Sequence, residues 1–275
     1  MMPVSTEPAL RVLGSLLLAG AIAGCAAPAA EEPAPGSTED AILGGQSETS
    51  WPAVGMLHFK SGNFGTGSLI SPTMVLTAAH VAKGNPTKFY FGSPPAGSAP
   101  TLANLRSVAV AQIIVHPCYD RPRSFGCPGT DAIDVALVRL AEPIHDVAPL
   151  PVVDRSIVEV WQFVSPYVGQ SCTAVGFGAH LGADQKATFG SRRSATSSVA
   201  MVGPTELVTV RGTGIASSGD SGGPLVCAGQ IIGTVRGSAG GAIPKGASPY
   251  ERVKEGYERS DLWRTWIATE GERLW

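Results

Sequence analysis

The chain has 275 residues, of which 44% are hydrophobic and 15% are charged, and its formal net charge is -2 at pH 7. This length is enough for one large all-β domain or two smaller domains with a hydrophobic core. The sequence has no run of lysine or arginine, so it offers no electrostatic footprint for nucleic acid, and we exclude that class of partner.

Residues 1–25 have the layout of a signal peptide for export. Arg11 precedes an apolar run, residues 12–22, which is too short to span a bilayer and is followed by small residues. The run ends in IAGC, residues 22–25, which resembles the lipobox of bacterial lipoproteins, where the cysteine is acylated and becomes the first mature residue. We therefore expect an exported protein, anchored through a lipid on Cys25 in a bacterial envelope membrane. The alternative is an ordinary signal peptide cut nearby, with Cys25 discarded and the protein secreted.

Residues 26–41 form a segment rich in Pro, Ala and Glu, with the sequence AAPAAEEPAPGSTEDA. A segment with almost no large apolar side chain cannot bury enough surface to offset the entropy that it loses on ordering. The sequence therefore predicts a tether or propeptide between the signal peptide and the folded part of the chain.

From residue 42 onward, short apolar or alternating runs are separated by turns rich in Gly, Pro and Ser. Alternation with frequent turn signals is typical of an antiparallel β-sandwich or β-barrel. The expected strands lie within residues 53–59, 74–80, 108–116, 134–140, 172–178, 206–212 and 230–237.

One helix is expected near the C-terminus. Ser260 or Asp261 can serve as its N-cap, and helical spacing then places four apolar residues on one side. These residues are Leu262, Trp263, Trp266 and Ile267. We expect the tryptophans to pack in the core.

Three residues in different parts of the chain have the types that acyl transfer by serine requires. His80 ends an apolar run, Asp134 begins another, and Ser221 lies among glycines in SSGDSGGPLV, residues 217–226. A serine nucleophile needs a base to take its hydroxyl proton and a buried carboxylate to hold the imidazole in the right tautomer. Taken one at a time, the histidine could instead be a core residue, the aspartate a turn cap, and the glycine-rich run a β-turn.

The joint pattern of TAAH, DVAL and GDSGGP, in this order, resembles the trypsin/chymotrypsin family of serine peptidases. The resemblance runs from about residue 42 to the C-terminus. It implies an all-β fold of two antiparallel six-stranded barrels with a C-terminal helix, the first barrel over residues 42–155 and the second over residues 156–275. The active site would then lie in the cleft between the barrels.

The resemblance also implies a role for each chemical group. His80 is expected to be the general base, Asp134 its orienting partner and Ser221 the nucleophile. The backbone N–H groups of Gly219 and Ser221 would form the oxyanion hole, where one donor is typically worth about 3 to 4 kcal/mol. A side chain at position 219 would hinder the backbone from turning its N–H toward the oxyanion.

Asp220 is expected to control activation. In the family, cleavage before a sequence like Ile-Val-Gly-Gly frees an α-amine, which folds inward and pairs with the aspartate that precedes the nucleophile. Here residues 42–45, ILGG, supply that sequence. We therefore expect a zymogen that is activated by cleavage between Ala41 and Ile42. Because alanine precedes the cut, the activating protease should tolerate small residues or be the protein itself.

The cysteines fit an exported protein, since disulfides need an oxidising compartment. With Cys25 assigned to lipid, four cysteines remain, and four allow three pairings. The resemblance implies that Cys172 pairs with Cys227 in the second barrel, which leaves Cys118 to pair with Cys127 across a short loop. The disulfide that usually flanks the catalytic histidine is missing at both of its positions.

The specificity pocket departs from that of trypsin-like enzymes. Six residues before the nucleophile, where the trypsin pocket has aspartate, stands Ile215, followed by Ala216, so cleavage after Lys or Arg is not expected. The segment that pairs with the substrate backbone corresponds to Arg236, Gly237 and Ser238. Arg236 would receive an acidic side chain if it faced the cleft, but the apolar floor favours small or medium apolar residues.

No metal or other cofactor is expected. The loop in which calcium-binding relatives place carboxylates corresponds to residues 93–104, SPPAGSAPTLAN, and contains none.

The motifs together predict a monomeric serine endopeptidase that hydrolyses polypeptides through an acyl-enzyme. The alternatives are a catalytically inactive relative that binds a partner protein and an esterase of the same fold.

Overall fold

The computed structural model describes residues 42, 45–95, 97–98, 101–122, 127, 132–158, 165–181, 187–188, 190–237 and 254–272. They belong to one unit of the chain, residues 37–275. The expected signal peptide with Cys25 and the expected tether, residues 26–41, lie outside the described residues. Among the described residues, no helix is long and apolar enough to cross a membrane.

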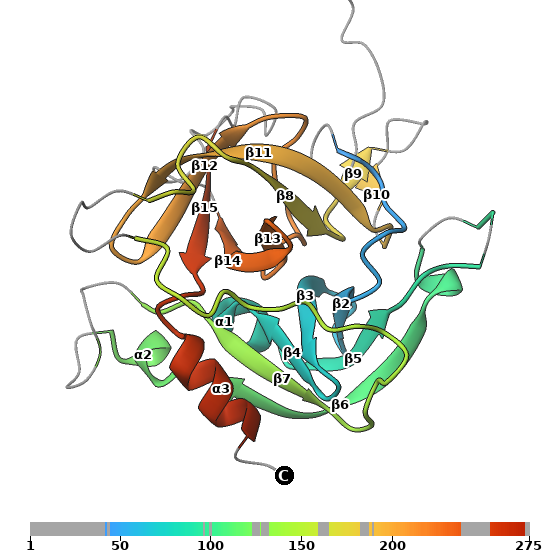
Figure 1. The fold of residues 1–275 in the computed structure, drawn as a ribbon. Helices are drawn as coiled ribbons and strands as arrows, with labels where there is room; N and C mark the ends of the chain where they lie inside the picture. The colour runs from blue at the N-terminus through green and yellow to red at the C-terminus, as the bar shows by residue number, and fades with distance from the viewer. Residues whose placement is uncertain are drawn as a thin grey trace, which may run out of the picture. The chain divides into compact units, whose positions relative to one another are not determined.

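The first barrel is a closed antiparallel sheet of six strands (Figure 1). Successive side chains of a strand point to opposite faces, so alternate apolar residues fill the interior. The core includes the fully buried Leu57, Leu69, Val75, Phe89 and Val138. The strand order is β2 (Val54–Phe59), β3 (Phe64–Ser71), β4 (Met74–Thr77), β7 (Ala136–Leu140), β6 (Arg106–Val115) and β5 (Pro86–Phe91).

The second barrel is built from a sheet of seven strands. A pairing between β11 and β8 closes six of them, and β1 pairs with the start of β11, so the first described strand joins the second barrel. A separate two-stranded ribbon consists of β9 (His180–Leu181) and β10 (Ala187–Thr188). The order in the large sheet is β1 (Gln46–Ser47), β11 (Arg193–Val202), β12 (Glu206–Arg211), β15 (Lys254–Arg259), β14 (Gln230–Gly237), β13 (Pro224–Cys227) and β8 (Ser171–Gly176).

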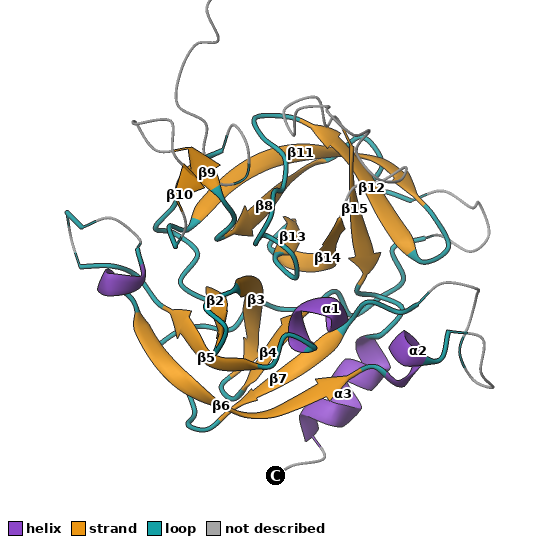
Figure 2. Ribbon diagram, turned by 180° about the vertical axis from the view of Figure 1, so that it is seen from behind, coloured by secondary structure: helices purple, strands orange, loops and turns teal. Residues whose placement is uncertain are grey.

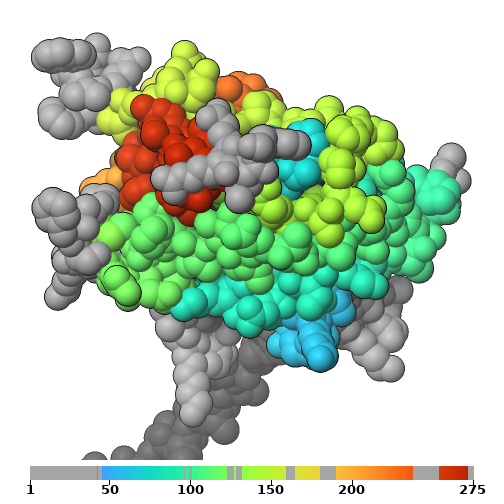
Figure 3. Space-filling model, turned by 90° about the horizontal axis from the view of Figure 1, so that it is seen from below, coloured from blue at the N-terminus to red at the C-terminus, as the bar shows by residue number. Residues whose placement is uncertain are grey.

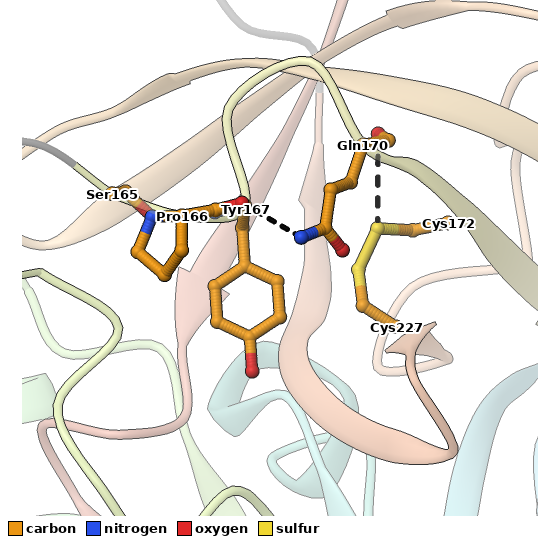
Figure 4. Close-up of a disulfide and its surroundings, with 6 residues drawn as sticks. All are labelled: Ser165, Pro166, Tyr167, Gln170, Cys172 and Cys227. Carbon is orange, nitrogen blue, oxygen red and sulfur yellow. Dashed lines mark hydrogen bonds between the residues drawn. A yellow bond between two sulfur atoms is a disulfide. The ribbon is translucent and has the colours of Figure 1, made fainter.

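A disulfide between Cys172 and Cys227 links the neighbouring strands β8 and β13, as the resemblance implied. It lies in the core of the second barrel, beside the turn that leads into β8 (Figure 4). Tyr167 of this turn packs in the same core, and the Gln170 side chain closes the turn by donating to the carbonyl of Pro166 (2.7 Å).

Short helices lie outside the strands. Within the described residues they are α1 (Ala79–Ala82), the 3-10 turn η1 (Leu102–Asn104), α2 (Pro117–Asp120) and α3 (Arg264–Glu272). The second disulfide, between Cys118 and Cys127, starts from α2, and it is the pair that the sequence analysis left. Figure 2 shows α1 directly after β4, on the side of the first barrel that faces the second.

Helix α3 follows the last strand of the second barrel but packs against the first (Figures 2 and 3). Trp263 and Ile267 are buried in a cluster with Leu137 of β7, and Trp266 is half-buried beside it. The expectation for Leu262 was wrong: the helix begins only at Arg264, so this residue lies in the preceding turn and is 38% exposed.

The expected fold class is confirmed: two closed six-stranded antiparallel barrels with a C-terminal helix. The strands that carry the apolar alternation form the barrel walls, and the glycine-rich segments form the connections. The connections that carry the TAAH, DVAL and GDSGGP motifs lie where the two barrels face each other. This arrangement positions the candidate active site.

Candidate active site

His80 and Asp134 both come from the first barrel. His80 lies in α1, directly after β4, and Asp134 leads into β7, which is the neighbour of β4 in the sheet. The Asp134 carboxylate accepts the backbone N–H of His80 through Oδ1 (2.9 Å), and Oδ2 lies 2.7 Å from Nδ1 of the ring. Asp134 is buried, whereas the His80 side chain is 36% exposed.

This geometry fixes the tautomer of the His80 ring. An ionised carboxylate only accepts hydrogen bonds, so the contact with Asp134 assigns the ring proton to Nδ1. The other ring nitrogen, Nε2, is then left as a proton acceptor. The pair therefore presents a base with a fixed orientation at a partly exposed position.

Ser221 lies in the loop that precedes β13, and this loop packs against the first barrel. The backbone N–H of Thr66 donates to the carbonyl of Ser221 (2.9 Å). Gly222 has a φ of +80°, and a Cβ at this position would overlap with the hydroxyl of Thr77. Only glycine permits both the conformation and the close approach. The loop with Ser221 is thus held against the end of β4, three residues before His80.

Gly219 is fixed by two neighbours from the first barrel. Its φ is +97°, and a Cβ here would overlap with the ring of Phe64. Its carbonyl accepts the hydroxyl of Thr66 (2.9 Å), which in turn accepts the backbone N–H of Phe177 (3.1 Å). Thr66 is fully buried and joins the two barrels at the nucleophile loop. Sequence reasoning missed it, because a threonine in a strand carries no distinctive signal.

A cleft of about 640 Å³ opens beside Gly219. Met56, Phe59 and Phe64 of the first barrel line one side, and Ser218 and Gly219 of the second barrel line the other. The lining of this cleft mixes apolar and polar residues and reaches Gly219, but it includes neither His80 nor Ser221.

Asp220 is buried, with 1% exposure, next to the backbone of Ile42. Its Oδ2 lies 3.2 Å from the Ile42 nitrogen and accepts the N–H of Ser217 (2.8 Å), while Oδ1 accepts the N–H of Gly178 (2.7 Å). Burial raises the pKa of the Asp220 carboxyl to about 6, although these backbone hydrogen bonds favour the charged form. The structure thus brings Ile42 and Asp220 together, 178 residues apart in the sequence.

The residues expected at the specificity pocket are mostly buried. Ile215 is 1% and Ala216 is 2% exposed, and both lie in the connection between β12 and β13. Gly237 ends β14, and Ser238 lies outside the described residues.

Arg236 is directed at another protein side chain. Its Nη1 lies 3.8 Å from Oε2 of Glu258, and its Nη2 donates to the carbonyl of Ala132 (3.5 Å). The side chain of Arg236 is 27% exposed. The sequence analysis considered an acidic side chain of the substrate as a partner for this guanidinium, whereas in the structure its counter-ion is Glu258.

Two buried carboxylates of β15 were missed by sequence reasoning. Glu255 is fully buried, lies opposite Thr209 of β12 and shares a face of the strand with Tyr257. Glu258 is 1% exposed and approaches Asp134, and burial raises its pKa to about 7. Both glutamates lie in KEGYER, residues 254–259, a segment that the sequence analysis did not predict as a strand. Among the described residues, no three His, Cys, Asp or Glu side chains gather so that they could hold a metal ion.

Two antiparallel barrels, with a histidine–aspartate pair from one and a serine in a glycine-rich loop from the other, define the class of trypsin-like serine proteases. The family model described as Trypsin matches residues 42–257. Because this match covers well over half of the chain, the protein belongs to the trypsin family.

Two curated relatives match part of the chain. A probable serine protease of Lysobacter enzymogenes is 35% identical over 132 residues, and the match covers 41% of this chain and 19% of that protein. The complement C1s subcomponent of Rattus norvegicus is 29% identical over 119 residues, 42% of this chain and 17% of that protein. The chain thus spans less than a fifth of the length of these relatives.

Solved structures share the fold. Human heparin binding protein is 21% identical with a TM-score of 0.59, over 82% of this chain and 94% of that one. Mouse neuropsin, a serine protease, is 23% identical with a TM-score of 0.59, over 83% of this chain and 99% of that one. At these identities the likeness shows the two-barrel fold alone.

Proposed function

We propose that the protein is a serine endopeptidase with a triad of His80, Asp134 and Ser221. The observation that carries this proposal is the 2.7 Å contact between His80 Nδ1 and Asp134 Oδ2, which leaves Nε2 of the ring as a base. His80 takes the hydroxyl proton of Ser221 as its oxygen attacks the scissile carbonyl. It gives the proton to the leaving amine, and the acyl-enzyme is then hydrolysed by a water that His80 activates in turn.

The oxyanion of each tetrahedral intermediate is stabilised by the backbone N–H groups of Gly219 and Ser221. The positive φ of Gly219 and the hydrogen bond from Thr66 to its carbonyl support this role, since donors must be held in place before charge develops. Each donor then contributes about 3 to 4 kcal/mol to the transition state.

Activation follows cleavage between Ala41 and Ile42 by a protease that tolerates small residues or by the protein itself. The 3.2 Å distance between the Ile42 nitrogen and Asp220 supports this step, because the freed α-amine would place a positive charge beside a buried carboxylate.

Trypsin-like proteases are generally secreted. We add that this protein is exported, and that Cys25 carries a lipid anchor.

The specificity pocket takes a small or medium apolar side chain before the cleaved bond. The apolar character of Ile215 and Ala216, which are both buried, supports this choice. Arg236 supports it too, because its guanidinium already has Glu258 as a counter-ion and is not left for an acidic substrate. A peptide library with varied residues before the cleaved bond tests this preference. Cleavage after Lys or Arg would contradict it. Such cleavage would point to Glu255 as the partner of the basic side chain, because Glu255 shares a face of β15 with Tyr257, which packs in the same core cluster as Ala216.

A catalytically inactive scaffold that binds a partner protein is the second candidate function. A solved structure described as a scabies mite inactivated protease paralogue is 17% identical with a TM-score of 0.60, over 84% of this chain and 97% of that one. The fold therefore also occurs in a protein described as inactivated. Arg236 beside the Asp134 segment is the departure from the family pattern that favours this candidate.

Labelling with a fluorophosphonate, measured by intact mass, separates these candidates. The comparison uses protein cleaved before Ile42, protein that retains residues 26–41, and a Ser221→Ala variant as the control. Labelling of the cleaved form alone, lost in the variant, is the expected result. Equal labelling of both forms would contradict the activation step. Absence of labelling in folded protein would reject catalysis and direct the search to partner proteins.

A further inference from the structure

Glu258 is a buried carboxylate that the proposed reaction steps do not use. Its Oε2 accepts the backbone N–H of Asp134 (3.3 Å), and its Oε1 accepts the indole N–H of Trp263 (3.1 Å). The same Oε2 lies 3.8 Å from Nη1 of Arg236. Glu258 therefore connects a strand of the second barrel to the residue of the first barrel that orients His80.

A β-bulge directs Arg236 toward this carboxylate. The register between β14 and β15 shifts between Val235 and Gly237, so Arg236 is the extra residue on its strand. Bulges change the direction of a side chain and occur often beside active sites. Here the guanidinium reaches both Glu258 and the carbonyl of Ala132, which belongs to the segment that carries Asp134.

The charges around Glu258 come from three directions. Arg236 of β14 is the cation, Asp134 approaches from the first barrel with His80 bound to it, and Glu206 lies opposite Glu258 on β12. The charges of Arg236 and Glu258 cancel when both are ionised. The Asp134 carboxylate then remains available to the His80 ring.

We propose that Glu258, paired with Arg236, is a positioning residue for Asp134, an inference that rests on the proposed role of Asp134 in catalysis. The Glu258 carboxylate holds the Asp134 backbone and occupies the guanidinium. When Glu258 is neutral, the guanidinium is left without its counter-ion and competes with His80 for the Asp134 carboxylate. The triad is therefore fully active only while Glu258 is ionised.

The pH dependence of labelling provides a test that a merely structural role would not pass. Since burial raises the pKa of Glu258 to about 7, activity requires Glu258 to lose a proton in addition to any proton that the triad itself must lose. The logarithm of the labelling rate of Ser221 should therefore fall more steeply on the acid side in the wild type than in Glu258→Gln. The two slopes should differ by about one, because the variant lacks the Glu258 proton.

The rates on the alkaline plateau give a second measurement. We expect Glu258→Gln to label about 10-fold more slowly, a smaller loss than the about 10²-fold that a 1 Å misplacement can cause. The double variant Glu258→Gln with Arg236→Gln removes the competing guanidinium as well, so it should recover most of the rate. It also replaces both partners of the buried pair, which protects the fold better than removal of one.

Asp261→Asn is the matched control, because Asp261 is another buried carboxylate after β15 and pairs with Arg259, not with the triad segment. It should lower stability but keep the acid-side slope of the wild type. If Ser221 of the wild type labels and both Glu258 variants keep its plateau rate and slope, this inference is overturned while the proposed function stands. If the folded wild type does not label at all, the proposed function fails first.

Discussion

Replacing Asp220 by asparagine should change how the stability of the uncleaved chain depends on pH. Burial raises the pKa of this carboxyl from 3.8 to about 6, so the native state binds more protons than the unfolded state between these values. The stabilisation from the bound proton is fully present below about pH 4 and is lost as the pH rises through about 6. A difference of about two pH units corresponds to about 3 kcal/mol.

Urea unfolding of Ser221→Ala protein at a series of pH values, with and without Asp220→Asn, measures this term. Between about pH 4 and pH 7, the protein with Asp220 should lose about 3 kcal/mol more stability than the asparagine variant. The titration of Glu258 is common to both proteins and cancels in the difference. After cleavage before Ile42, the α-amine lies beside the carboxylate, so the extra loss should disappear. Parallel pH profiles in the uncleaved pair would refute this reasoning.

Three further substitutions test the contacts around the site. Thr66→Val should lower the free energy of unfolding by about 1 to 3 kcal/mol, because it leaves two buried backbone groups without their partner, and urea titration beside Thr66→Ser checks this. Gly219→Ala should slow fluorophosphonate labelling by about 10²-fold or more, because the positive φ and the Phe64 ring exclude a Cβ and displace an oxyanion donor. Replacing both Cys172 and Cys227 by alanine should cost about 4 kcal/mol in thermal or urea unfolding, since their sequence separation is 55 residues.

The antiparallel β class follows from patterns that the sequence displays, whereas the two barrels and the pairing of His80 with Asp134 follow from the resemblance to the trypsin family. Strands such as residues 54–59 and 136–140 are short, mostly apolar runs between turns, and nearly all of their residues are buried. The motif around Ser221 adds glycines whose conformation and close contacts the structure explains. These features are local in sequence, and local patterns can be recognised without knowledge of the partner strand.

The features that were missed depend on which strands meet. β1 has two exposed residues and no periodic signal, so its pairing with β11 could not be predicted. Arg236 and Glu258 meet because a bulge shifts the register of two adjacent strands, and neither residue alone indicates the other. Thr66 acts through contacts with a loop that lies 153 residues later. Pairings over such distances are set by the tertiary structure and not by local propensity.

The pairing of β1 with β11 has a consequence for synthesis. Ile42 and β1 emerge from the ribosome before the first barrel, yet their partners lie in the second barrel, and Asp220 follows Ile42 by 178 residues. At about 5 to 20 residues per second, this interval lasts about 10 to 35 s. During that time the N-terminal segment has no place to dock, so its docking next to Asp220 belongs to the last stage of assembly. A nascent chain interrupted before residue 220 cannot form the contact proposed to control activity.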